Sequence, residues 1–132
     1  RAMDRDNLEP QVKAVAEARE VGCELVGGLG GLSVDPDAKR PAAMREVCGR
    51  VGTYGAPVLP GGMCMLAYHH KIPVMGLPGC VMYQKASLFD LVLPRILAGQ
   101  RLTRRDFTHL GHGGYCEQCP ECHYPNCSFG RG

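Results

Sequence analysis

The sequence carries little net charge and few aromatic side chains. Its 132 residues have a formal net charge of +2, and they include five tyrosines, three phenylalanines and no tryptophan. A nearly neutral chain offers no electrostatic basis for binding nucleic acid or an anionic membrane surface. The scarcity of aromatic side chains also disfavours a nucleic-acid module. We therefore expect neither nucleic acid nor a membrane as a partner.

Long apolar segments are also absent. No run approaches the ~20 apolar residues that a membrane-spanning helix needs. The N-terminal residues Arg1, Asp4, Arg5 and Asp6 are charged, and the apolar segment of a signal peptide does not follow them. These absences predict a cytoplasmic protein. Because the chain begins with Arg1 and not with Met, it fits a piece of a longer protein.

Glycine, proline and cysteine, by contrast, are plentiful. The 18 glycines and 10 prolines are spread between apolar segments, which indicates loops on a folded scaffold and not a disordered chain. Four of the eight cysteines crowd into residues 116–127. The other four stand in apolar surroundings and are expected to be small buried hydrophobic residues; they are Cys23, Cys48, Cys64 and Cys80.

Hydrophobic spacing predicts alternating helices and strands. Leu8, Val12 and Val15 recur at the spacing of a helix, whereas residues 72–77 form a short, mostly apolar run that is typical of a buried strand. Pro94 should kink the last helix or end it early. The predicted elements are a helix at 8–21, a strand at 23–26, a glycine-rich loop at 27–37, a helix at 38–50, extended segments at 53–59 and 63–68, a strand at 72–77 and a helix at 87–97.

This order predicts an α/β fold in which helices cover a mostly parallel sheet. Such sheets bind ligands at the carboxyl ends of their strands. The loops at 27–37 and 77–80 both fall at such ends, so we expect the binding site there. The chain becomes rich in glycine and cysteine from Gly111 onward, which divides it into a domain of residues 1–110 and a tail of residues 111–132.

The first loop has the composition of a phosphate site. Gly30 and Gly31 let backbone N–H groups approach an anion closely, and Ser33 adds a hydroxyl donor. Asp35 and Asp37 would repel a phosphate unless a hard cation such as Mg²⁺ lay between them. The residues alone favour a structural alternative slightly, because Asp37 could simply cap the helix that begins at the next residue.

Three segments carry a resemblance to a known family. They are residues 30–37 (GGLSVDPD) with Pro41 after them, residues 54–61 (YGAPVLPG) and residues 73–80 (PVMGLPGC). In this order they resemble the molybdopterin-binding fold that molybdopterin adenylyltransferases and molybdopterin molybdotransferases share. The resemblance covers roughly residues 8–130. It is closest to a bacterial and archaeal subgroup that ends in a cysteine-rich tail.

The resemblance implies a partial three-layer α/β domain that binds molybdopterin, the pterin dithiolene that carries molybdenum or tungsten. The first strands of the fold have no counterpart before Arg1. In the family, the glycine loop lies beside the terminal phosphate, so Asp37 would be the catalytic acidic residue, with Mg²⁺ as its ion and Asp35 as a second candidate. The residues implied to contact the cofactor are Gly30, Gly31, Ser33, Pro60, Gly61, Pro78, Gly79 and Cys80. Molybdotransferases usually have Asn at the position of Cys80. The Cys80 thiol lacks the hydrogen-bond donor and acceptor that an Asn amide would provide.

Two kinds of function follow from the resemblance. The chain could be an enzyme of molybdenum or tungsten cofactor biosynthesis that transfers an adenylyl group or the metal. The alternative is a non-catalytic carrier or sensor of molybdopterin or of its adenylylated form, which docks on a molybdenum or tungsten enzyme. The family fold commonly forms oligomers, so a homo-oligomer is expected.

The tail carries a second pattern, Cys-x2-Cys-x2-Cys-x4-Cys. Four thiolates at this spacing can surround one tetrahedral ion. Zn²⁺ fits a structural site of this kind, although the closely spaced thiols also resemble the ligands of an iron–sulfur cluster, so both remain open. The tail could also be a redox or interaction module on an unrelated scaffold. The predicted metal ligands are Cys116, Cys119, Cys122 and Cys127.

Overall fold

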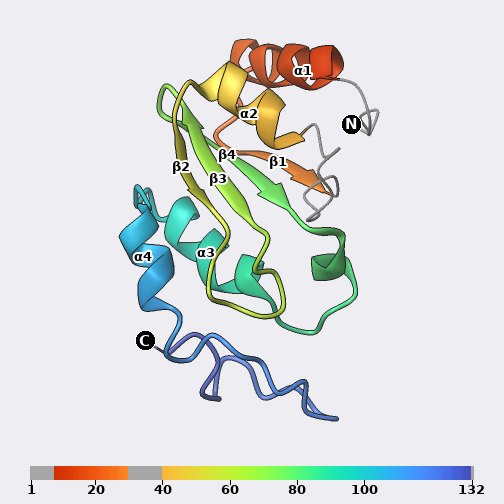
Figure 1. The fold of residues 1–132 in the computed structure, drawn as a ribbon, viewed down its shortest axis with the longest axis vertical. Helices are drawn as coiled ribbons and strands as arrows, with labels where there is room; N and C mark the ends of the chain where they lie inside the picture. Colours follow the sequence, from red (N-terminus) through yellow and green to blue (C-terminus); the bar gives the residue numbers. More distant parts are fainter. Residues whose placement is uncertain (1–7, 30–39, 132) are drawn as a thin grey trace.

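The computed structural model describes residues 8–29 and 40–131. They form a four-stranded sheet with helices on both faces, and the tail extends beyond one end (Figure 1). The elements are α1 (Leu8–Glu20), β1 (Val26–Leu29), α2 (Arg40–Cys48), β2 (Val51–Tyr54), β3 (Met65–His69), β4 (Ile72–Leu77), the 3₁₀ turn η1 (Gly79–Met82), α3 (Leu88–Leu97) and α4 (Arg104–His109).

The strands lie in the order β1-β4-β3-β2. β1 pairs with β4 in parallel, whereas β3 runs antiparallel to both β4 and β2. Three strands therefore run in one direction and only β3 is reversed. The prediction of a mostly parallel sheet is thus confirmed for strand direction, but only one of the three pairings is parallel. The reason is local, because a tight turn at His70 and Lys71 joins β3 to β4, and such a turn can join only antiparallel strands.

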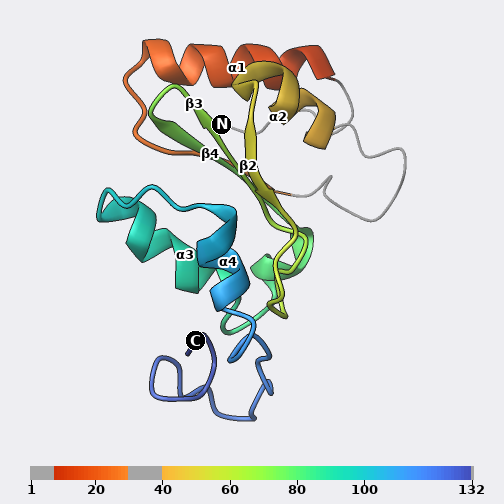
Figure 2. The same cartoon turned by 60° about the vertical axis from the view of Figure 1, so that its left-hand side comes forward.

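Two hydrophobic cores hold the three layers together. Side chains alternate along β3, so that Met65 and Ala67 pack with α1 and α2 while Leu66 packs with α3. The core that contains Met65 and Ala67 also includes Val15 of α1 and Met44 of α2. Figure 2 shows the resulting arrangement, with α1 and α2 above the sheet and α3 and α4 below it. The predicted α/β fold class with three layers is confirmed.

Strand β1 begins later than the sequence predicts. The glycines Gly27 and Gly28 were expected in a loop, but they lie inside the strand and pair with Met75 and Gly76 of β4. A glycine weakens a strand, because it loses more conformational entropy on folding and has no side chain to pack. Here the ladder of hydrogen bonds to a buried neighbouring strand outweighs that local preference.

Helix α4 is an element that the hydrophobic pattern did not reveal. Its N-terminus is a capping box, in which the carboxylate of Asp106 accepts hydrogen bonds from the backbone N–H and the hydroxyl of Thr103 at 2.7 and 2.9 Å. These bonds and the ion pair with Arg95 lower the pKa of Asp106. Phe107 is only 1% exposed and fixes the helix to the core. The spacing of Thr103 and Asp106 was the available sequence signal.

Pro94 lies inside α3, yet the helix continues to Leu97. Of the two outcomes that the sequence predicted, a kink or an early end, the early end is therefore absent. Proline has no N–H, so the carbonyl of Asp90, four residues earlier, loses its helical partner. The hydroxyl of Tyr124, in the tail, donates to that carbonyl at 3.2 Å. The proline thus creates an acceptor that ties the tail to α3.

We expect the Tyr124→Phe substitution to destabilise the protein by about 1–2 kcal/mol, because it leaves the Asp90 carbonyl without a partner. Pro94→Ala restores a competing helical N–H, so the same Tyr124→Phe change should cost clearly less in that background. A double-mutant cycle from urea unfolding measures the difference. Equal costs in the two backgrounds would show that Tyr124 contributes independently of the proline.

Within the two described ranges, no helix is long and apolar enough to cross a membrane.

Candidate functional site

Two of the predicted binding segments leave the sheet side by side. The last residue of β1, Leu29, pairs with the last residue of β4, Leu77, in a parallel ladder. Gly30 follows the first of these residues and Pro78 follows the second. The sheet therefore starts both segments at one edge, where open α/β sheets bind ligands. The third segment follows β2, which runs in the same direction as β1 and β4.

A groove of about 860 Å³ lies at this edge. Its volume is within the range of small-molecule and cofactor sites. Three segments that are distant in sequence form its walls, namely the β2–β3 connection, the start of η1 and the tail. The lining residues include Pro60, Gly61, Leu59, Pro78, Cys80 and Tyr115.

Backbone hydrogen bonds hold the β2–β3 connection in a compact shape. The N–H of Ala56 donates to the carbonyl of Gly62 at 2.7 Å, and the N–H of Leu88 donates to the carbonyl of Pro60 at 3.0 Å. Gly61 has a φ of 105°, and an added Cβ there would lie 2.9 Å from the Cβ of Leu88. Only glycine suits this position, because both the conformation and the space exclude a side chain.

Gly61 also carries a buried polar group. The residue is buried, and within the described part of the chain no acceptor is found for its backbone N–H. A buried N–H is normally paired, so this group could serve as a donor to a ligand that reached it. Much of the remaining surface is apolar, including Leu59 at 59% exposure and Tyr115 at 69%.

The structure brings together four of the predicted cofactor-binding residues. Pro60, Gly61, Pro78 and Cys80 come from two separate segments and line the same groove. Gly79 lies between two of them but is not part of the lining. The other predicted residues lie outside the described ranges; they are Gly30, Gly31, Ser33, Asp35 and Asp37.

The tail supplies a wall of the groove that the sequence did not predict. Tyr115 forms a parallel bridge with Leu59, in which the N–H of Leu59 donates to the carbonyl of Gly114 at 2.7 Å. The N–H of Cys116 donates back to the carbonyl of Leu59 at 2.8 Å. No local pattern could have revealed this pairing, because 56 residues separate the two bridged positions.

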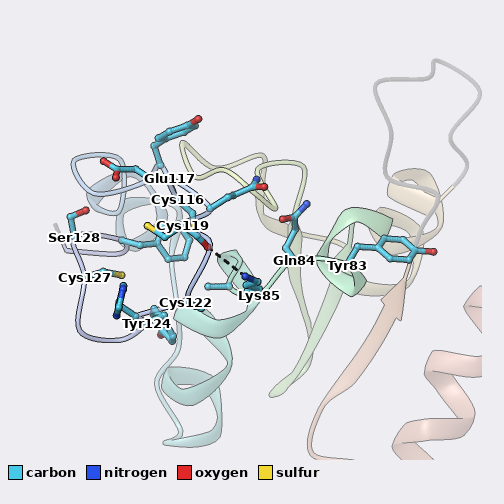
Figure 3. Close-up of a pocket in the computed structure, with 15 residues that line it drawn as sticks. Tyr83, Gln84, Lys85, Cys116, Glu117, Cys119, Cys122, Tyr124, Cys127 and Ser128 are labelled. Atoms are coloured by element: carbon cyan, nitrogen blue, oxygen red, sulfur yellow. Dashed lines mark hydrogen bonds between the residues drawn. The ribbon is translucent and has the colours of Figure 1, made fainter.

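All four tail cysteines line a second cavity, of about 260 Å³ (Figure 3). Cys116 and Cys127 are half-buried, whereas Cys119 and Cys122 are exposed. Among the described residues, no group of three or more His, Cys, Asp and Glu side chains is placed so that it could hold a metal ion. The predicted ligands thus share a cavity without closing around a common centre.

The four scattered cysteines differ in their surroundings. Cys64 is fully buried, and this burial raises its pKa to about 12, so its thiol stays protonated and unreactive. Cys23 and Cys48 are half-buried. The expectation that all four are buried is wrong for Cys80, which is exposed because it follows the carboxyl end of β4 and lines the groove.

The fold is similar to that of a solved molybdopterin biosynthesis MoeA protein from Pyrococcus horikosii. The two chains are 25% identical, with a TM-score of 0.52. The similarity covers 71% of this chain and 22% of the other, so this chain matches about a fifth of the length of its solved relative. No protein-family model and no curated protein sequence matches the chain. The predicted resemblance is confirmed as a fold shared with a protein of molybdopterin biosynthesis, whereas the cysteine-tailed subgroup remains a prediction.

Proposed function

We propose that the chain acts in molybdenum or tungsten cofactor biosynthesis and binds molybdopterin in the groove at the carboxyl edge of the sheet. The observation that carries this proposal is the convergence of Pro60, Gly61, Pro78 and Cys80 on one groove. The resemblance had assigned these residues to the pterin from two separate segments. The shared fold with a molybdopterin biosynthesis protein supports the same ligand.

The end of β1 supports a place for the ligand's phosphate. Because Leu29 ends β1 beside the end of β4, the glycine loop begins next to the segment that carries Pro78 and Cys80. In the proposal, the pterin lies in the groove, and Gly30, Gly31 and Ser33 bind the phosphate. Asp37, with Asp35 as the second candidate, would hold Mg²⁺ there. Molybdopterin supplies the dithiolene sulfurs that bind molybdenum or tungsten.

The proposal extends to an enzyme that transfers an adenylyl group or the metal, with binding alone as the alternative. For adenylyl transfer, positioning of the phosphate and neutralisation of its charge by Mg²⁺ would carry most of the catalysis. A carrier would need the groove but not Asp37. A homo-oligomer, and docking on a molybdenum or tungsten enzyme, stay predictions for either case.

The binding proposal is tested by native mass spectrometry of the protein purified from its own host without oxygen. We expect bound molybdopterin with the unmodified chain. Cys80→Trp places a bulky side chain on the groove wall and should weaken binding about tenfold or more, which corresponds to about 1.4 kcal/mol. Val21→Trp is the matched control, because Val21 is 77% exposed and lies outside the groove. Equal retention by both variants would exclude the groove as the binding site.

Asp37→Asn then separates the enzyme from the carrier. With purified molybdopterin, ATP and Mg²⁺, an adenylyltransferase should lose turnover in this variant and keep its bound pterin. If the unmodified chain forms no adenylylated product, adenylyl transfer is excluded. If pterin binding persists in that case, metal transfer and the carrier are the functions that remain.

A further inference from the structure

Four cysteines from different positions of the tail line one cavity. Cys116, Cys119, Cys122 and Cys127 all contribute to it, although eleven residues separate the first from the last. Thiolates are the preferred ligands of zinc in structural sites, where four of them surround one ion. A cavity of about 260 Å³ is much larger than an ion, so the four side chains have room to turn inward.

The cysteine loop is tied to the core at both ends. The N–H of Cys116 is bonded to the carbonyl of Leu59, and Phe129, two residues after Cys127, is 4% exposed. The N–H of Gly130 donates to the carbonyl of Gly113 at 2.7 Å, which closes the tail into a loop. The first and last cysteines are therefore held in place by the fold, whereas Cys119 and Cys122 lie on its exposed part.

A positive charge lies beside this loop. The Nζ of Lys85, just before α3, donates to the carbonyl of Pro120 at 2.6 Å. It also donates to the carbonyl of Cys119 at 3.5 Å (Figure 3). Four thiolates around one Zn²⁺ carry net negative charge, which a nearby ammonium group stabilises. The lysine thus both holds the loop over the cavity and complements the charge of a thiolate site.

The same loop forms part of the groove wall. Tyr115, Cys116 and Gln118 line both the cysteine cavity and the groove. A metal ion bound to the sulfur of Cys116 would therefore restrain the backbone of Cys116, which is hydrogen-bonded to Leu59.

We propose that Cys116, Cys119, Cys122 and Cys127 bind one Zn²⁺ ion, and that this ion fixes the tail segment that forms one wall of the groove. Binding requires the exposed Cys119 and Cys122 to turn into the cavity that they already line. The proposal does not depend on which molecule the groove binds.

The first test is the metal content of the full chain, purified under reducing conditions and analysed by mass spectrometry of its elements. We expect about one zinc ion per chain. Cys122→Ser should lose it, whereas Cys23→Ser, a change of the same type outside both cavities, should keep it. Equal zinc in the two variants, or iron with acid-labile sulfide in place of zinc, would overturn the proposed site.

Alkylation offers a second readout on the unmodified chain. Cys119 and Cys122 should be protected from iodoacetamide until a chelator removes the zinc. Cys80 is exposed and outside the cysteine cavity, so it should react in both states, and buried Cys64 should react in neither. Modification of Cys119 and Cys122 at the rate of Cys80 in the zinc-loaded chain would contradict the proposal.

Hydrogen exchange tests the link to the groove in the absence of pterin. We consider hydrogen exchange that requires the tail to open. A free zinc concentration of a hundred times the Kd should slow this exchange by about a hundredfold. The protected amides should include those of Leu59 and Cys116. Cys122→Ser should exchange at the zinc-free rate in both conditions. Unchanged exchange at Leu59 in a chain that does bind zinc would overturn the coupling to the groove.

Discussion

Replacing Phe129 with alanine is expected to destabilise the whole protein by about 3–5 kcal/mol, the usual cost of truncating a buried aromatic side chain. Phe129 is 4% exposed and belongs to the same core cluster as Leu88, Val92 and Phe107. Its ring also lies edge-on to Tyr124, with 6.2 Å between the ring centroids. The loss should therefore reach the sheet and α3, and not the tail alone.

Urea unfolding followed by two probes measures this effect. Circular dichroism reports on the helices, and alkylation of the half-buried Cys127 reports on the tail. We expect the two transitions to coincide and to move together in Phe129→Ala. Tyr115→Ala is the matched control, because this tail aromatic is 69% exposed and its loss should change stability by less than about 0.5 kcal/mol. If the tail opened alone while the helical transition stayed in place, residues 111–131 would be an independent unit.

The second large effect is expected from Gly114→Ala. An added Cβ at this position would overlap the carbonyl oxygen of Pro57 and lie 3.1 Å from that of Leu110. Both neighbours are backbone atoms, which cannot rotate away as a side chain could. The tail must then lift from Leu59 and lose the two hydrogen bonds that form the bridge. We expect a cost of about 3 kcal/mol, at the upper end for overpacking.

Thermal unfolding and hydrogen exchange at Leu59 measure the consequence. Gly27→Ala is the matched control, since nothing lies within 4 Å of a Cβ at Gly27. The Gly27→Ala variant should be as stable as the unmodified chain, and its hydrogen exchange at Leu59 should remain slow. A Gly114→Ala protein as stable as the unmodified chain would mean that the tail can shift without loss and that the groove wall is adaptable.

Some features of the predicted binding residues could be recognised in the sequence, and others depend on the tertiary structure. The Pro-Gly segments at 60–61 and 78–79 were recognisable because glycine and proline mark sharp turns wherever they occur. Their convergence on one groove could not be predicted from the sequence. It depends on β2 and β4 running in the same direction and on the packing of Leu88 behind Gly61. The acidic residues Asp35 and Asp37 lie outside the described ranges and rest on the resemblance alone.

The elements show the same division. The spacing of apolar residues was sufficient to predict α1, α3 and β4, because these segments bury one continuous face or run. It failed at Gly27 and Gly28, where pairing with β4 decides the conformation. At Pro94 it left a kink and an early end open, and Tyr124, thirty residues later, provides the donor for the freed carbonyl of Asp90.

By itself the sequence determined the α/β class, the glycine and proline turns after the strands, and the four thiols of the tail. These features depend on local spacing and on side-chain chemistry, which a sequence displays directly. Only the tertiary structure decided that the tail packs into the core through Phe129 and pairs with Leu59 as a wall of the groove. The physical reason is that such contacts join residues far apart in the chain, and their free energy comes from burial and hydrogen bonds that exist only once the chain has folded.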